Sequence, residues 1–210
     1  MRLYFIRHGE TDWNKIRRLQ GKSDVRLNEF GIHLAKETAK GLKDVPFDIA
    51  YTSPLVRAKE TAKLVLGDRQ IPLVEDKRIE EMGFGIYEGM CSSEENMEIP
   101  DPKFLYFFTA PWKYHAPKGG ETMEELLKRT GDFLEDLRKN PIHKKQTILV
   151  STHGAALCAL LAHIKGNDLK HFWGKGMHKN CAVTIVDCID GDYKIIEEEI
   201  LYYKDEVKPW

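Results

Sequence analysis

The stretch Leu3-Tyr-Phe-Ile-Arg-His-Gly-Glu10 joins a short apolar run directly to two basic residues, a glycine and an acid. Its first four residues are typical of a strand buried on both faces of a sheet. In open α/β sheets ligands bind beyond the carboxyl ends of the parallel strands. We therefore expect Arg7 and His8 to lie at such an end, with Gly9 letting the backbone approach what they bind. An isolated Arg-His-Gly is better explained by a strand that ends in surface charges. Whether these residues form a binding site therefore depends on the residues that the rest of the chain brings to them.

Strands and helices alternate along most of the chain. The apolar patterns predict strands over 47–51, 71–74 and 146–152, helices over 29–42, 55–66, 123–138 and 154–164, and a final hairpin of strands over 180–187 and 193–200 that turns at Asp190-Gly191. Such alternation predicts parallel strands joined by right-handed crossovers. We therefore predict an α/β fold, a three-layer α/β/α sandwich with a mostly parallel central sheet. No repeat or linker divides the chain, so residues 1–210 are predicted to be a single domain.

Chemically active side chains recur where these strands end. Arg57 falls in the first turn of the helix after the second strand, and His153-Gly154 directly follows the strong apolar strand 146–152. Together with Arg7 and His8 they are predicted to meet at one edge of the sheet. Guanidinium groups bind phosphate oxygens in bidentate fashion, and a neutral imidazole is a competent nucleophile towards phosphorus. The sequence therefore predicts a site for phosphoryl chemistry.

Two neighbouring loops offer further groups to this edge. The polar segment 15–22 is predicted to be a loop, in which Gln20 and Gly21, together with Thr11 and Asn14 just before it, are candidate hydrogen-bond donors to an oxyanion near Arg7. The adjacent acids Glu80 and Glu81 enter a glycine-rich loop, and only one of them is expected to face Arg7.

The segment from about 90 to 120 has a different composition. It combines four prolines, several acids and six aromatic rings without a long period. We predict a small helical and aromatic lid inserted in the domain, although a local satellite core would give the same pattern. The rings favour a substrate whose non-phosphate part is apolar or flat.

Bulk composition limits the partners. The 32 basic and 33 acidic residues leave a formal charge of -1, which gives no basic field for nucleic acid. The chain has no apolar stretch of membrane-spanning length and no secretion signal. The four cysteines lack zinc-ligand spacing and are expected to be thiols in or near the core. We predict a cytoplasmic protein that binds neither nucleic acid nor membrane. Its oligomeric state is left open.

The chain resembles the histidine phosphatase superfamily, which includes cofactor-dependent phosphoglycerate mutases, fructose-2,6-bisphosphatases and bacterial phosphatases. The resemblance rests on five blocks in family order: Arg7-His8-Gly9-Glu10-Thr11 with Asn14; Ser53-Pro54 with Arg57-Ala58 and Thr61-Ala62; the segment Glu81 to Gly89; Gly120-Glu121 with Arg129; and Ser151-Thr-His153-Gly154. They span nearly the whole chain.

The resemblance implies a division of labour. His8 would accept the phosphoryl group, Arg7 and Arg57 would hold its oxygens, and His153 would stabilise the transition state. Glu81 would protonate the leaving alkoxide and then activate water. The implied catalytic set is Arg7, His8, Arg57, Glu81 and His153. The implied substrate-binding set is Arg7, Asn14, Gln20, Gly21, Arg57 and Gly154. No metal and no cofactor are implied.

Hydrolysis of a small phosphorylated metabolite is therefore the predicted function. A mutase needs extra cations for a second phosphate, yet between 82 and 120 the basic residues are Lys103, Lys113 and Lys118, and Met82 stands where mutases typically carry arginine. The alternatives are a cofactor-dependent phosphoglycerate mutase and a non-catalytic phosphate-binding regulatory module. The sequence does not select among sugar phosphates, phosphoglycerates, nucleotides and cobalamin-pathway esters.

Overall fold

The computed structural model of the chain describes residues 1–207. The described strands form one six-stranded sheet in the order β3-β2-β4-β1-β5-β6. Their bounds are β1 Arg2–Arg7, β2 Ile49–Thr52, β3 Leu73–Glu75, β4 Thr147–Thr152, β5 Val183–Ile189 and β6 Asp192–Ile200. The pairs β1–β4, β2–β4 and β2–β3 are parallel, whereas β5 pairs antiparallel with β1 and β6. The prediction of a mostly parallel sheet is confirmed.

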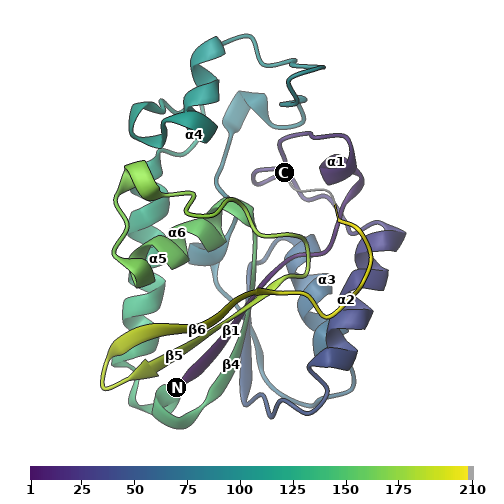
Figure 1. Cartoon of the computed structure of the whole chain (residues 1–210), viewed down its shortest axis with the longest axis vertical. Coiled ribbons are helices and arrows are strands. Elements are labelled where there is room, and N and C mark those ends of the chain that lie inside the picture. The colour runs from purple at the N-terminus through teal and green to yellow at the C-terminus, as the bar shows by residue number, and fades with distance from the viewer. Residues whose placement is uncertain (208–210) are drawn as a thin grey trace.

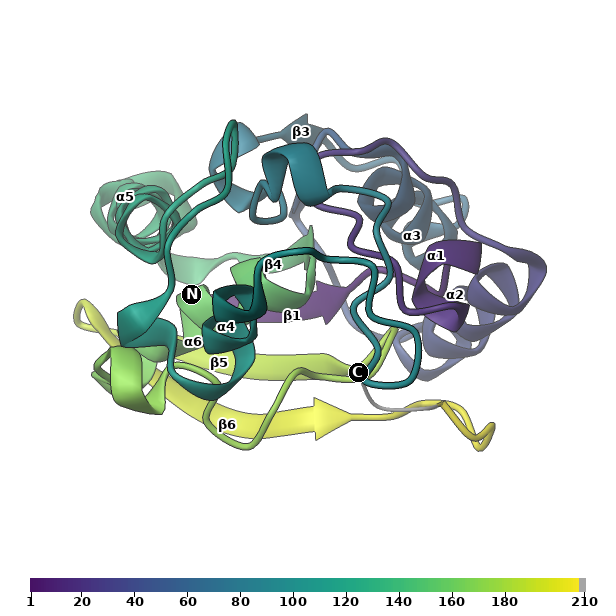
Figure 2. The same ribbon diagram turned by 90° about the horizontal axis from the view of Figure 1, so that it is seen from above.

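Helices cover both faces of this sheet (Figures 1 and 2). On one side lie α2 (Glu29–Gly41) and α3 (Val56–Leu66), and on the other lie α5 (Met123–Lys139) and α6 (Gly154–Lys165). Alternate residues of β1 serve the two cores: Tyr4 and Ile6 pack with α2 and α3, whereas Leu3 and Phe5 pack with α5 and α6. Both faces of β1 are thus buried, which explains its continuous apolar run and gives the predicted three layers.

Several of the helices begin where a polar side chain accepts one of the free backbone N–H groups. The Asn28 side chain accepts the N–H of Gly31 at 2.8 Å, and Thr122 and Glu125 form a capping box at the start of α5. A capping box also explains α1 (Asp12–Lys15), a short helix that the sequence did not predict and that ends where the predicted loop 15–22 begins: Thr11 Oγ1 accepts the N–H of Asn14 at 3.1 Å. One turn buries no face, so it leaves no period in the sequence.

Two predicted boundaries need correction. Helix α3 begins at Val56, one residue later than predicted, with Leu55 at the cap position. Strand β3 starts two residues later than predicted. It is short and largely exposed, so the apolar residues of the sequence do not define its bounds. Gly9 is also required by packing, because a Cβ on Gly9 would lie 2.6 Å from the carbonyl oxygen of Gly31 in α2.

The segment between residues 91 and 120 stands above the carboxyl ends of the strands (Figure 1). It contains α4 (Tyr106–Thr109) flanked by the 3₁₀ turns η3 (Pro102–Leu105) and η4 (Pro111–Lys113). Its buried rings, Phe104, Phe107 and Tyr114, pack with Phe84 and with the first turns of α6 in one cluster. The aromatic residues therefore form a core of their own that is continuous with the main body.

The remaining described elements are small 3₁₀ turns: η1 (Lys77–Ile79), η2 (Gly85–Tyr87), η5 (Pro141–Lys145) and η6 (Leu169–His171). In residues 1–207 no helix has the length and apolar character needed to cross a membrane. All four cysteines are free thiols; Cys91, Cys158 and Cys181 are buried, and Cys188 is partly buried.

Candidate active site

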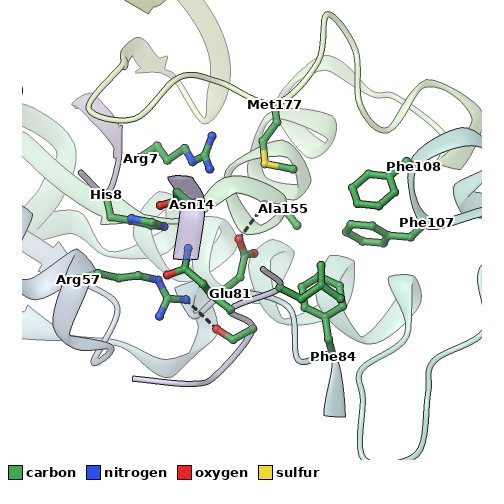
Figure 3. A pocket seen from close by; sticks show the side chains of 13 residues that line it. Arg7, His8, Asn14, Arg57, Glu81, Phe84, Phe107, Phe108, Ala155 and Met177 are labelled. Atoms are coloured by element: carbon green, nitrogen blue, oxygen red, sulfur yellow. Dashed lines mark hydrogen bonds between the residues drawn. The ribbon is translucent and has the colours of Figure 1, made fainter. Parts of the chain in front are cut away.

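Most of the polar residues predicted at the strand ends line one cavity (Figure 3), whereas His153 lies buried behind His8 and is not part of the lining. Arg7 and His8 come from the end of β1, Arg57 from the first turn of α3, and Glu81 from the loop after η1. The cavity is small, about 390 Å³ when the space open to solvent is included. Its lining comprises Arg7, His8, Asn14, Leu19, Gln20, Gly21, Arg57, Glu81, Phe84, Phe107, Phe108, Ala155 and Met177.

His8 presents a neutral imidazole to this cavity. Its Nδ1 lies 2.7 Å from the Gly9 carbonyl oxygen. Because a carbonyl oxygen only accepts, Nδ1 carries the proton and Nε2 keeps its lone pair. Burial lowers the pKa of His8 well below its ordinary 6.5, and the charges of Arg57 and Arg7 lower it further. The imidazole is thus held in its nucleophilic form at neutral pH.

His153 lies next to His8, with ring centroids 5.1 Å apart. The side chain is fully buried, and neither ring nitrogen has a hydrogen-bond partner among the described residues. Burial again lowers its pKa well below 6.5, followed by the charge of Arg57 and the neighbouring His8. Since buried polar atoms are normally paired, this histidine retains two unused positions for hydrogen bonding beside the nucleophile.

The two arginines are buried cations. Arg57 donates to the carbonyl oxygens of Ser23 at 2.8 Å and Gly21 at 2.7 Å, and Arg7 donates to the carbonyl oxygen of His178. These bonds compensate part of the cost of Arg57 at a helix N-terminus. Burial lowers the pKa of Arg57 to about 10, so it remains charged at neutral pH, and burial also lowers the pKa of Arg7. The Nε atom of each has no partner within residues 1–207.

Glu81 is the member of the acidic pair that lines the cavity. Its carboxylate accepts the backbone N–H groups of Met82 at 2.9 Å, Ala155 at 3.2 Å and Ala156 at 3.1 Å. The last two belong to the first turn of α6, where free N–H groups and the helix dipole favour an anion. Glu80 points away and lies 3.4 Å from the Lys22 ammonium group. Only one carboxylate therefore faces Arg7, as the sequence indicated.

Of the other predicted binding residues, some line the cavity and one does not. Asn14, Gln20 and Gly21 line the cavity, and the buried Gln20 Oε1 has no partner in the described part of the chain. Gly154 does not line it, because the side chain of Met177 covers this position: a Cβ on Gly154 would lie 2.3 Å from Met177 Sδ. The glycine provides room for that methionine.

Several residues of the site could not be found from sequence. Met177 belongs to an irregular loop, which is held by the bond of Arg7 to the next residue's carbonyl group, and no pattern marks it. Leu19 and Ala155 likewise carry no signal of their own. Phe107 and Phe108 were marked only as part of the aromatic segment. In residues 1–207 there is also no group of three or more His, Cys, Asp or Glu side chains placed to hold a metal ion.

Arg129 fixes the loop that carries Glu81. Its Nη1 donates to the carbonyl oxygens of Arg78 at 2.8 Å and Glu80 at 2.7 Å, and its Nη2 donates to that of Glu81 at 3.1 Å. Nε and Nη2 also bind the Glu121 carboxylate at 2.5 and 2.8 Å. The sequence indicated this pair only as one block of a resemblance. The structure shows that it secures the backbone on both sides of Glu80.

Comparison with known proteins agrees with this arrangement. The model of the histidine phosphatase superfamily (branch 1) matches residues 3–199. The chain belongs to the histidine phosphatase superfamily. An uncharacterized phosphatase of Bacillus subtilis, PhoE, is 37% identical over 78% of this chain and 77% of its own length. Phosphoserine phosphatase 1 of Hydrogenobacter thermophilus is 32% identical over 95% of this chain and 87% of its own.

The solved structure of YhfR from Bacillus stearothermophilus superposes with a TM-score of 0.87 at 34% identity, covering 96% of this chain and 98% of that one. A histidine phosphatase fold is thereby established over almost the whole chain. With phosphatases among its relatives, this member of the superfamily is a phosphomonoesterase.

Proposed function

We propose that the cavity hydrolyses a small phosphorylated metabolite through a phosphohistidine on His8. The observation that carries this proposal is the neutral His8 ring, with Nε2 free, in a cavity that two buried guanidinium groups also line. Arg7 and Arg57 hold the phosphoryl oxygens, and His153 donates to them as negative charge develops. Asn14, Gln20 and Gly21 supply further contacts to the phosphoryl group or to the ester.

The reaction proceeds as two displacements. The Nε2 lone pair of His8 attacks phosphorus, the bond to the ester oxygen breaks, and protonated Glu81 transfers its proton to that oxygen. The Glu81 carboxylate then removes a proton from water as the water oxygen attacks phosphohistidine. Inorganic phosphate leaves, and His8 and protonated Glu81 are regenerated.

The test is phosphate release from p-nitrophenyl phosphate in the presence of a chelator, by the parent protein and by His8→Ala. We expect turnover by the parent and a loss of at least about a thousandfold in the variant, because the covalent route is removed. A label transferred from substrate should appear on His8 as an acid-labile phosphoenzyme. Label on serine or aspartate would refute the assignment of the nucleophile.

Hydrolysis is favoured over mutase chemistry by the position of Met82. This side chain is fully buried in the cluster with Phe84 and Phe107, so it supplies no cation for a second phosphate. The discriminating assay is 3-phosphoglycerate with a bisphosphate primer. Release of inorganic phosphate supports the hydrolase, whereas efficient formation of 2-phosphoglycerate would support the mutase.

We further propose that residues 1–210 act as one catalytic domain in which the segment from about 90 to 120 is the lid over the cavity. Phe107 and Phe108 of this segment line the cavity, which supports that role. A cytoplasmic location is supported by the four free thiols, since disulfides are the rule only in oxidising compartments.

A further inference from the structure

The cavity has two chemically different ends (Figure 3). Arg7, His8 and Arg57 lie on one side, and the rings of Phe84, Phe107 and Phe108 lie on the other, with the Glu81 carboxylate between them. Leu19 and Met177 extend the apolar lining. If the phosphoryl group occupies the cationic end, the ester oxygen comes next to Glu81. The alcohol portion of the substrate then projects towards the aromatic wall.

The aromatic wall, which consists of Phe84, Phe107 and Phe108, is tightly packed. The Phe107 ring is 1% exposed and makes edge contacts with Phe84, Phe108 and Trp173 at centroid distances of 5.1, 4.9 and 4.9 Å. The indole N–H of Trp173 donates to the Phe107 carbonyl oxygen at 2.8 Å. Packing of the segment explains why Phe107 is buried. The same packing does not explain why three aromatic rings border the space beside Glu81. A preformed apolar wall binds flat groups with little ordering cost.

The lining offers no charged side chain to pair with charges on the alcohol portion, and its polar side chains, Asn14 and Gln20, are assigned to the phosphoryl group or to the ester. Its charged side chains are Arg7, Arg57 and Glu81, all of which serve the phosphoryl group or the ester oxygen. The α-ammonium and α-carboxylate groups of phosphoserine would be desolvated against phenylalanine and methionine without partners, which is costly. The carboxylate of phosphoglycerate meets the same difficulty.

We propose that the preferred substrates are phosphomonoesters of apolar, flat alcohols of the aryl or arylalkyl class, and not those of amino acids or hydroxy acids. This inference rests on the proposed function and specifies its substrate class. Phe108 has a particular part in it, because it lines the cavity while being only partly buried. It can therefore be truncated without opening the centre of the aromatic cluster.

The test compares benzyl phosphate with phosphoserine and 3-phosphoglycerate, all of which release alkoxides that need protonation. We expect kcat/KM for benzyl phosphate to be about 10- to 100-fold higher, from burial of the ring and the absence of stranded charges. In Phe108→Ala this ratio should fall by about tenfold. Trp112→Ala is the matched control, since Trp112 lies in the same segment, is 45% exposed and does not line the cavity. It should leave the ratio unchanged.

A binding measurement separates this inference from the proposed function. Calorimetry should show benzylphosphonate binding about tenfold or more tightly than 2-amino-4-phosphonobutyrate, a phosphoserine analogue that resists hydrolysis. That result in a protein without turnover would refute the hydrolase and support the aryl preference. Equal or weaker binding of benzylphosphonate, or higher kcat/KM for the polar esters, would overturn the aryl preference and leave the hydrolase standing.

Discussion

Replacing Arg129 by lysine should separate the position of Glu81 from its chemistry. The planar guanidinium group of Arg129 donates hydrogen bonds to three backbone carbonyl groups, those of Arg78, Glu80 and Glu81. It also binds the Glu121 carboxylate. A lysine ammonium keeps the charge next to Glu121 but cannot match this geometry. At least two of the three carbonyl groups would lose their donor, and the loop would gain freedom.

The expected magnitudes follow from these contacts. Hydrogen bonds to a charged group contribute about 1.5–3 kcal/mol each, and lysine with water recovers part of that, so we expect a loss of about 2–3 kcal/mol of unfolding free energy. A displacement of the acid by about 1 Å costs up to about a hundredfold in rate. For benzyl phosphate we therefore expect kcat/KM to fall about 10- to 100-fold. For p-nitrophenyl phosphate it should fall less than about threefold, because p-nitrophenolate departs without a proton.

The assay is kcat/KM, since it reports the steps up to cleavage of the P–O bond and excludes the later attack of water. Arg138→Lys is the matched control: it makes the same change on the same helix, and the Arg138 guanidinium forms an exposed pair with Glu135. Arg138→Lys should leave kcat/KM unchanged for both esters. An equal fall for the two esters in Arg129→Lys would show that the clamp supports the fold or the phosphate site, and the positioning role would be refuted.

Three further predictions concern protonation and packing. Because the neutral form of His8 is the nucleophile and burial lowers its pKa, kcat/KM should stay high as the pH falls below 6.5, and a profile that drops by half at pH 6.5 would contradict this. His8 and His153 bind protons more weakly in the folded than in the unfolded state, so each should cost about 1.4 kcal/mol of unfolding free energy per pH unit as the pH falls below 6.5; in denaturant titrations the slope for His8→Asn should be smaller than that of the parent by this amount. Gly31→Ala should cost about 1–3 kcal/mol of unfolding free energy, because its Cβ would lie 2.1 Å from the Glu10 carbonyl oxygen, whereas in Gly83→Ala the Cβ meets only the Lys22 side chain at 3.4 Å and should cost little.

Much of the site follows from the ends of strands. Arg7, His8 and His153 lie at the ends of apolar runs that are typical of buried strands, and parallel connections bring such ends together. The choice of Glu81 over Glu80 was different, because nothing local distinguishes two adjacent acids. The structure supplies the reason in the backbone N–H groups of α6, which are 74 and 75 residues away along the chain.

Residues whose role depends on contacts between distant segments were interpreted poorly. Gly9 follows a strand, so the sequence predicts a role beside the ligand, whereas its close packing on the backbone of Gly31 in α2 is visible only in the folded protein. Met177 lies in an irregular loop, and its place over Gly154 depends on where Arg7 binds that loop. Such positions have no periodic or compositional signal, since the constraint arises only once the layers are assembled.

The use of the α6 N-terminus gives the cavity its direction. A helix N-terminus at the end of a β-strand is a ready site for phosphate, but here the N–H groups of Ala155 and Ala156 bind Glu81. In the proposed reaction the phosphoryl group relies instead on Arg7, His8 and Arg57, which lie on the other side of that carboxylate (Figure 3). Binding Glu81 to the helix thus places the acid between the cations and the aromatic wall. Only an ester whose oxygen lies beside Glu81 can contact both the cations and the aromatic wall. The alcohol portion of such an ester must then face the phenylalanines.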